Sequence, residues 1–397
     1  MSHIVSFMIE GLAGRPDPLE LKLNRDTNIF FGANGSGKTS LLKVLHAAMA
    51  NETDILARVP FVSAEVHIFS LTWNKVFVRS LKKAQATTSG PSKWRRVVHR
   101  ELRIGEEIVT VKEPYIEKKL KWSCSPKTPE KASTTRWAHE YLPTSRLHVS
   151  DEPMSPFFEE SGSIRSFLTE DQLDVFFAHS VDNLWRRYSA QILGAVRTAQ
   201  EQGLASILRA VLAPESTSGK RRTSTLTSAT AYDRVHNFLK RQGSASILGS
   251  RKAFDKRYAA DTTLQDVVRD IDLVETKIQS AMESRNSLQE LISKMFIANK
   301  EIQFTDESID VKTPSGDKIG LESLSSGEKH LLRILVQVLL VGESSLMIDE
   351  PEISMHVVWQ KSLIESMRKL NPNAQFILAT HSPEIMAEVE DDKIFRI

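Results

Sequence analysis

Cysteine is almost absent from this sequence, since Cys124 is the single one among 397 residues. One thiol excludes an intrachain disulfide and a cysteine-rich zinc site, and it is typical of a reducing compartment. No uninterrupted apolar run reaches about 18 residues, and MSHIVSFMIEGLAG at the start has no basic segment before an apolar core. We therefore expect a soluble, cytoplasmic protein.

An excess of charge of either sign is also absent, with 52 Lys and Arg against 50 Asp and Glu. This balance excludes a generic polycation, so a nucleic-acid surface must be local. Residues 81–147 are the candidate, with fifteen Lys or Arg against seven Asp or Glu and with Trp94 and Trp122 among them. Such a cluster binds phosphate backbones or docks an acidic protein, and tryptophans there also pack sheet faces.

A glycine-rich stretch, GANGSGKT at residues 32–39, fits the pattern G-x-x-x-x-G-K-[ST]. The strand-like NIFF precedes it, and SLLKVLHAAM follows with apolar residues at helical spacing. Glycines let backbone N–H groups converge on phosphate oxygens, and the helix start adds partial positive charge. Lys38 is expected to reach the β and γ phosphates, and the Thr39 hydroxyl to bind Mg²⁺. The candidate nucleotide-binding residues here are Gly32, Ala33, Asn34, Gly35, Ser36, Gly37, Lys38, Thr39 and Ser40.

Two acidic residues follow the apolar run of SSLMIDEPE, residues 344–352. Its apolar residues predict a buried parallel strand, and such strands deliver functional residues at their carboxyl ends. Asp349 is predicted as the second Mg²⁺ ligand beside Thr39, and Glu350 as the base that orients and activates water. Acidic residues also end ordinary strands, so the glycine loop makes this interpretation specific.

Two further motifs flank the acidic pair. In LSSGEKHLLRILVQVLL, residues 324–340, a serine cap and a glycine precede an apolar helical run, which predicts a second anion-binding helix start. A plain N-cap is the alternative, and the position just ahead of the acidic strand favours the functional reading. In ILATHSPEIM, residues 377–386, His381 follows a short apolar strand, as a γ-phosphate sensor does. The candidates at the helix start are Ser325, Ser326, Gly327 and Glu328.

In chain order, GANGSGKT, LSSGEK, SLMIDEPE and ATHSPE resemble the Walker A, signature, Walker B and switch-histidine motifs of ABC-type ATPases. The resemblance is closest to the soluble branch of SMC, Rad50, RecF and overcoming-lysogenization (OLD) ATPases. Within that branch, EPEISMHVVWQ followed by QFILATHSPEIM is most similar to OLD-like ATPases of the AAA15 and AAA21 types. The similar regions lie near the two ends of the chain.

This resemblance implies an α/β P-loop NTPase fold, an ABC ATPase head whose mixed sheet has an antiparallel subdomain and which carries a helical or short coiled-coil insertion. It implies ATP and Mg²⁺ as cofactors and a homodimer in which two heads enclose two nucleotides. Ser326 and Gly327 would contact the γ phosphate held by the other subunit, and Ser354 would lie at the same seam. The implied catalytic residues are Glu350, His381 as the switch, and Lys38.

The motifs depart from the family pattern in two places. The signature reads LSSGE where transporters have LSGGQ, and no Q-loop glutamine is identified, although HEYLPTSRL at 139–147 falls in that region. Arg15, between the expected strands SFMIE and LELKL, is a candidate nucleotide contact. An exposed turn arginine is the alternative for it.

The motif positions predict a discontinuous head formed by residues 1–148 and 298–397, with a helical insertion at 149–297. AEVHIFSLTW, KVFVRSL and EEIVTVKE predict an antiparallel sheet, and EIQFTDESIDVKTPSGDKIGL a strand pair with a PSGD turn. In the insertion we expect helix over 169–212 with weak points at Gly194 and Gly203, a Ser/Thr-rich loop, and a helix over AYDRVHNFLKRQ. The near-heptad spacing of 262–297 predicts a helix of roughly 54 Å. It forms a short stalk or dimerisation arm, or it packs within its own subunit.

These expectations favour an ATP-driven switch in which ATP closes paired heads, hydrolysis opens them and the change controls an effector. Proteins that resemble this chain are ATPase halves of bacterial anti-phage defence systems, such as PARIS-type and Septu-type pairs, where a separate polypeptide supplies a nuclease. OLD enzymes carry a TOPRIM nuclease domain after the ATPase, whereas AEVEDDKIFRI here predicts an acidic turn and a final strand. The expected partners are a second copy and a separate TOPRIM or HNH nuclease, with no membrane.

Two other functions compete with this one. A RecF-like repair ATPase would act directly on DNA. A transporter subunit is disfavoured by the LSSGE signature and by the large insertion.

Overall fold

The computed structural model describes residues 1–83, 97–104, 107–114, 120–127, 129–144, 170–212, 227–241, 248–296 and 300–397. The chain divides into two compact units, Met1–Leu168 with Ser325–Ile397, and Thr169–Leu324. We call the first the head unit and the second the helical unit. Among the helices in the described ranges, none combines the length and apolar character needed to span a bilayer.

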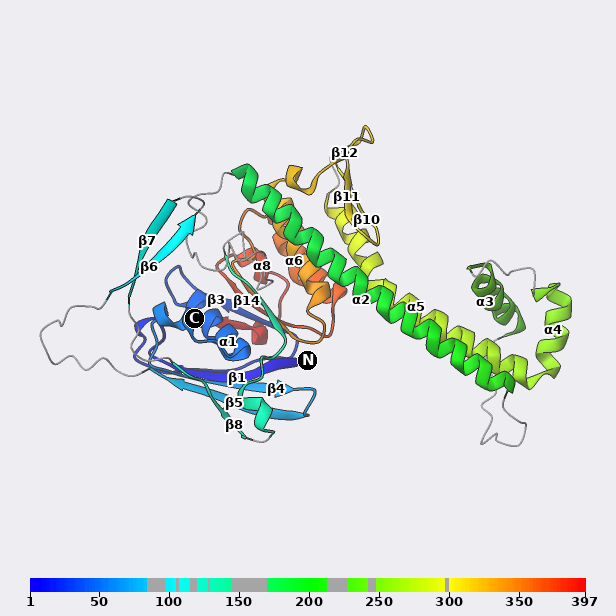
Figure 1. The fold of residues 1–397 in the computed structure, drawn as a ribbon, viewed down its shortest axis with the longest axis horizontal. Helices are drawn as coiled ribbons and strands as arrows, with labels where there is room; N and C mark the ends of the chain where they lie inside the picture. The colour runs from blue at the N-terminus through cyan, green and yellow to red at the C-terminus, as the bar shows by residue number, and fades with distance from the viewer. Residues whose placement is uncertain are drawn as a thin grey trace, which may run out of the picture. The chain divides into compact units, whose positions relative to one another are not determined.

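A five-stranded parallel sheet lies in the head unit (Figure 1). Its order is β15 (Ile394–Arg396), β3 (Thr27–Phe31), β14 (Gln375–Thr380), β13 (Ser345–Asp349) and β9 (His139–Leu142). All neighbouring strands are parallel, so their carboxyl ends lie along one edge of the sheet. The residues of β13 and β14 are all buried, as expected for continuous apolar runs in a parallel sheet.

A second, antiparallel sheet of the head unit has the order β2 (Leu19–Lys22), β1 (Ser2–Glu10), β4 (Ser63–Ser70), β5 (Lys75–Lys82) and β8 (Ser123–Ser125). Buried and half-buried residues alternate strictly along β4, which is the pattern of a sheet with one face in the core. The backbone of β6 (Val97–Ile104) and β7 (Glu107–Pro114) forms a separate hairpin.

Helix α1 (Lys38–Ala50) joins the two sheets of the head unit through one apolar core. Leu41, Leu42 and Leu45 are fully buried with residues of β1 and β4 from the antiparallel sheet and with Met347 and Ile377 from the parallel sheet. Full burial of a leucine side chain stabilises by about 1.5–3 kcal/mol. This packing fixes the start of α1 against the sheet edge.

The remaining helices of the head unit are α6 (Ser326–Leu340), α7 (Val357–Leu370) and the short α8 (Pro383–Met386). Nearly every residue of α6 after its first turn is buried, and the Asn371 side chain joins α7 to α6 by donating to Val338 O and Gly342 O, both at 2.9 Å. Short 3-10 turns cover Leu12–Gly14, Asp54–Arg58, Glu130–Ser133 and Asp391–Lys393.

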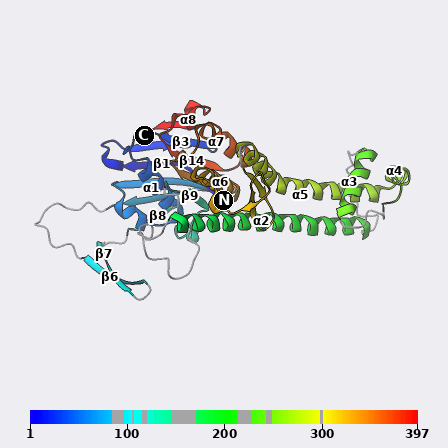
Figure 2. The ribbon, with the colours of Figure 1, turned by 90° about the horizontal axis from the view of Figure 1, so that it is seen from above.

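Two long helices lie side by side in the helical unit, α2 (Glu170–Leu212) and α5 (Thr262–Met295), with α3 (Ser228–Arg241) and α4 (Arg251–Ala260) at one end of the pair (Figures 1 and 2). Gly203 of α2 meets α5 so closely that a Cβ atom there would lie 2.0 Å from Val274 Cγ2. Gly203 is therefore a contact point between helices, and the expected weak points at Gly194 and Gly203 are wrong because α2 runs through both. The near-heptad residues of α5, such as Val274 and Ile278, pack against α2 of their own chain.

A three-stranded antiparallel sheet also belongs to the helical unit: β10 (Glu301–Phe304), β11 (Ile309–Lys312) and β12 (Lys318–Ile319), followed by a 3-10 turn at Leu321–Ser323. Trp185 of α2 donates from its indole to Thr305 O at 2.8 Å, and Arg285 of α5 donates to Phe304 O at 2.5 Å. These contacts group residues 300–324 with the helices, whereas we had assigned residues 298–324 to the head.

The fold class predicted from the sequence, an α/β P-loop ATPase head with an antiparallel subdomain and a helical insertion, is confirmed. The helices expected over 169–212, AYDRVHNFLKRQ and 262–297 correspond to α2, α3 and α5. Most of the basic 81–147 segment, including Trp94 and Arg146, lies outside the residues or side chains that the structure describes.

Candidate functional site

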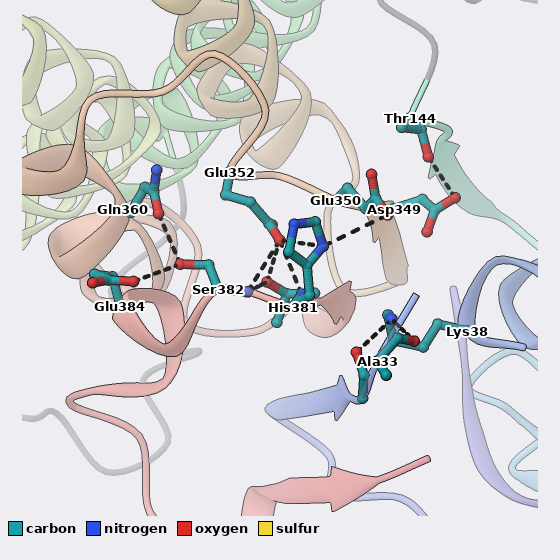
Figure 3. A network of polar contacts seen from close by, with 12 residues as sticks. Ala33, Lys38, Thr144, Asp349, Glu350, Glu352, Gln360, His381, Ser382 and Glu384 are labelled. Atoms are coloured by element: carbon teal, nitrogen blue, oxygen red, sulfur yellow. Dashed lines mark hydrogen bonds and ion pairs between the residues drawn. The ribbon is translucent and has the colours of Figure 1, made fainter. Parts of the chain in front are cut away.

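The glycine loop at 32–39 leads from β3 into α1, as the sequence predicted. Gly35 and Gly37 have φ values of 83° and 100°, which favour glycine. Lys38 is 5% exposed, and its ammonium group donates to Gly32 O at 2.7 Å and to Ala33 O at 3.0 Å. The lysine side chain thus crosses the glycine loop, where a phosphate would bind (Figure 3).

Asp349, at the end of β13, lies beside the first turn of α1. Its Oδ1 accepts a hydrogen bond from the Thr39 hydroxyl at 3.1 Å, and its Oδ2 accepts one from the Thr144 hydroxyl at 2.7 Å. Thr144 follows β9, the strand that pairs with β13. The structure therefore brings together the two predicted metal ligands and adds Thr144, which the sequence analysis had left unassigned within HEYLPTSRL.

Burial raises the pKa of the Asp349 carboxyl above its ordinary value of 3.8, while hydrogen bonds from Thr144 and Thr39 and the charges of Lys43 and Lys38 lower it. A buried carboxylate whose ionised form lacks full compensation favours a bound cation. Mg²⁺ is commonly held by one or two carboxylates together with substrate phosphates and water. Thr39 and Asp349 fit that donor set, and the described residues contain no group of three or more His, Cys, Asp or Glu able to hold a metal alone.

Glu350 and His381 follow neighbouring strands at the same sheet edge. Glu350 has a left-handed backbone, with φ of 53°, and its N–H donates to Ala379 O of β14 at 2.7 Å. His381 Nδ1 lies 3.7 Å from Glu350 Oε1 and 3.4 Å from Glu352 Oε1. The imidazole therefore lies between two carboxylates (Figure 3).

Glu352 is a site residue that the sequence analysis missed. It is buried, and one of its oxygens binds the loop that carries His381. No signal within DEPE at 349–352 marks it, because a glutamate that follows a proline in a loop is ordinarily exposed.

The signature segment begins α6 with Ser325 as N-cap. The Ser325 hydroxyl accepts from Glu328 N at 3.3 Å, and the Glu328 carboxylate accepts from Ser325 N at 2.6 Å, which forms a capping box. The backbone N–H groups of Ser326 and Gly327 are then the remaining donors of the first turn. A Cβ atom at Gly327 would lie 2.3 Å from Ser354 O, so the signature contacts the residue predicted for the same seam.

Arg15 reaches the glycine loop, where its guanidinium donates to Ser36 O at 3.4 Å. The contact places it beside the predicted phosphate loop.

Comparisons with known proteins give partial matches. Residues 204–387 match a family described as "AAA domain, putative AbiEii toxin, Type IV TA system". This match covers less than half of the chain and begins after the glycine loop.

Two curated relatives are similar over short segments. "Retron Vc95 probable ATPase" of Vibrio cholerae serotype O1 biovar El Tor is 30% identical over 93 residues, which are 20% of this chain and 18% of the relative. "Retron Ec83 probable ATPase" of Escherichia coli is 29% identical over 85 residues, 18% of this chain and 16% of the relative. The aligned segments thus span less than a fifth of either relative.

Among solved structures, an Smc head domain from Pyrococcus furiosus, bound to the C-terminal domain of ScpA, aligns over 98% of this chain and 92% of its own, with 13% identity and a TM-score of 0.40. The SMC head domain of Thermotoga maritima aligns over 97% and 91%, with 11% identity and a TM-score of 0.39. The family match supports an AAA domain over part of the chain, and the head unit has a parallel sheet of the α/β class. The OLD-like subtype stays a prediction.

Proposed function

We propose that this protein is a Mg²⁺-dependent ATPase whose hydrolysis cycle works as a conformational switch. The observation that carries the proposal is the convergence of Lys38, Asp349, Glu350 and His381 at the carboxyl edge of one parallel sheet, where α/β proteins bind ligands. The names of the retron relatives, each a probable ATPase, support the same activity.

The chain's own residues have separable tasks in this mechanism. Loop 32–39 and the start of α1 bind the triphosphate, and Lys38 exchanges its bonds to Gly32 O and Ala33 O for phosphate oxygens. Thr39 and Asp349 would hold Mg²⁺, which neutralises charge on the phosphates. Glu350 orients the attacking water, and His381 contacts the γ phosphate.

The switch requires two copies in our proposal, with Ser326 and Gly327 of one head facing the glycine loop of the other. The exposure of these segments supports this: Ser325, Ser326 and Ser354 are exposed, and Val357 and Val358 at the start of α7 are 43% and 61% exposed. Exposed apolar side chains favour contact with protein. In the same proposal, the cycle controls a partner effector, a TOPRIM or HNH nuclease of an anti-phage defence system, and the toxin and retron names of the similar proteins support that context.

ATP turnover by the purified protein tests the first part. Lys38→Ala is expected to abolish hydrolysis, and Glu350→Gln to bind ATP without turning it over and to accumulate as a dimer in light scattering. Lys22→Ala and Glu20→Gln, exposed positions on β2, are the matched controls and should keep wild-type rates. Normal turnover by Glu350→Gln would show that another residue activates the water.

Purification from the native operon tests the second part. A nuclease that copurifies with this chain, and whose activity depends on ATP, is the expected result. Strong stimulation of the isolated ATPase by DNA, with no copurifying protein, would favour the RecF-like alternative.

A further inference from the structure

Glu352 carries a charge into the interior of the site, since its side chain is 7% exposed. Three donors, from the last residue of β14 and the loop after it, converge on its Oε1. They are the Thr380 hydroxyl at 2.7 Å, the His381 N–H at 3.0 Å and the Ser382 N–H at 3.2 Å. One carboxylate oxygen therefore fixes three consecutive residues, 380–382, which we call the switch loop.

The second oxygen of the same carboxylate is buried, and none of the described residues donates a hydrogen bond to Oε2. An unpaired buried acceptor costs about 1–3 kcal/mol, and more when it is charged. A buried glutamate that only stabilised the fold would have hydrogen-bond donors at both carboxylate oxygens. The cost indicates that the position keeps its carboxylate for the chemistry of the site.

The His381 ring lies next to the Glu352 carboxylate. Its Nδ1 is 3.4 Å from Glu352 Oε1, while the imidazole side chain is 44% exposed. A carboxylate beside a functional imidazole restricts the orientation of the ring.

We propose that Glu352 is the positioning residue of the γ-phosphate sensor, tying the loop after β13 to the end of β14 and the loop that follows it, and setting the orientation of His381. The inference rests on the proposed ATPase function, because it assigns a role within that same site.

The connection extends from the switch loop to α7. The Ser382 hydroxyl donates to Gln360 Oε1 at 2.8 Å, with Glu384 Oε2 as a second acceptor at 3.1 Å, and Gln360 Nε2 donates to Met355 O at 2.8 Å. Figure 3 shows Glu352, Ser382 and Gln360 in one network with His381. A movement of the sensor is thereby linked to the segment that follows Ser354.

The test is steady-state ATP hydrolysis by Glu352→Gln, which keeps the size of the side chain and removes its charge. We expect kcat to fall about tenfold or more, in the range of other residues that orient a functional histidine, with the KM for ATP within about twofold of wild type. Thr380→Val removes one of the three donors without changing charge and should give a smaller loss of kcat. Glu388→Gln, an exposed glutamate farther along the same segment, is the control and should behave as wild type.

A double-mutant cycle separates positioning from a structural role. If Glu352 acts through His381, Glu352→Gln should lower kcat less than about threefold in a His381→Ala background, because the sensor is already lost. Equal losses in both backgrounds would overturn the inference, as would a Glu352→Gln enzyme with wild-type kcat. Should Glu352→Gln fail to fold by circular dichroism, the same cycle is run with Thr380→Val and decides by the same criterion.

Failure of the proposed function gives a different result. If the wild-type protein does not hydrolyse ATP at all, the assignment of the whole site is wrong. If it does so and the cycle is additive, the role of Glu352 alone is wrong.

Discussion

Replacing Thr144 by valine removes one hydrogen bond from the candidate metal ligand and changes little else. The hydroxyl donates to Asp349 Oδ2 at 2.7 Å, and valine has almost the same shape as threonine. We expect the substitution to weaken the apparent affinity for Mg²⁺ and to leave the glycine loop intact. The effect is predicted in the Mg²⁺ dependence of hydrolysis.

The magnitude follows from the burial of Asp349, which is 1% exposed. Water cannot replace the lost donor there, and a hydrogen bond to a charged group contributes about 1.5–3 kcal/mol. That free energy corresponds to a factor of about 10–150 in an equilibrium constant. Loss of residues that orient a metal ligand costs about 10–100-fold in metal affinity, which agrees with this range.

The assay is ATP hydrolysis at saturating ATP over a titration of free Mg²⁺. For Thr144→Val we expect the half-saturating Mg²⁺ concentration to rise about tenfold or more, with activity restored at high Mg²⁺. Thr53→Val is the matched control, because its hydroxyl donates to the neutral carbonyl of Leu120 at 3.2 Å, at the far end of α1. The control should titrate as the wild type does.

One outcome refutes this reasoning. Thr39→Val removes the other hydroxyl on Asp349 and, in our assignment, a metal ligand itself. If Thr39→Val shifts the Mg²⁺ titration and Thr144→Val leaves it unchanged, the Thr144 hydroxyl does not orient Asp349.

Three further predictions concern other parts of the chain. Burial and the charge of Arg25 lower the pKa of His3 from 6.5 to about 4. The stability that neutral His3 supports above pH 6.5 is therefore lost as the pH falls through 4. His3→Phe should reduce this loss of the free energy of unfolding, measured by urea unfolding at a series of pH values. Gly203→Val should destabilise the α2–α5 pair by about 1–3 kcal/mol, whereas Gly194→Ala, which meets nothing within 4 Å, should stabilise it by about 0.5–1 kcal/mol, both measured by urea unfolding. Arg15→Gln should raise the KM for ATP several-fold with a smaller effect on kcat, and an unchanged KM would mean that this arginine supports the loop alone.

The sequence predicted the parallel-sheet edge of the site because each motif there has a local signal. A glycine loop after a strand, acidic residues after an apolar run and a histidine after another run all mark carboxyl ends of strands. Parallel pairing of β3, β14 and β13 then brings Lys38, Asp349 and His381 together. Local sequence patterns were therefore sufficient to predict that these three residues share a site.

Local sequence patterns could not predict the site roles of Thr144 and Glu352, and the reasons differ. Thr144 lies two residues after a four-residue strand, β9, whose pairing with β13 joins segments about 200 positions apart, and no pattern within β9 specifies that partner. Glu352 follows a proline in a loop, where a glutamate is ordinarily exposed. Its role depends on the donors of the loop after β14, which are fixed by tertiary packing.

The segment between Asp349 and α7 gives Gly327 a packing role that is separate from nucleotide contact. Glu350 and Ser354 both have left-handed backbones without being glycine, with φ of 53° and 62°, and each such residue costs roughly 1–3 kcal/mol. The Glu350 N–H bond to Ala379 O holds one end of this strained segment, and the close approach of Gly327 to Ser354 O holds the other. Glycine at 327 is thus required by packing within one subunit, since any side chain would displace the strained backbone of Ser354.

Loss of activity in Gly327→Ala would therefore follow either from lost packing against Ser354 or from lost contact with a nucleotide. Ser326 is exposed beside Gly327, and packing does not restrict its side chain in this way. Ser326→Arg is the substitution that separates them: it should prevent the ATP-dependent dimer of the Glu350→Gln protein while leaving ATP binding by the monomer intact, and a dimer that persists would place the signature away from the second nucleotide.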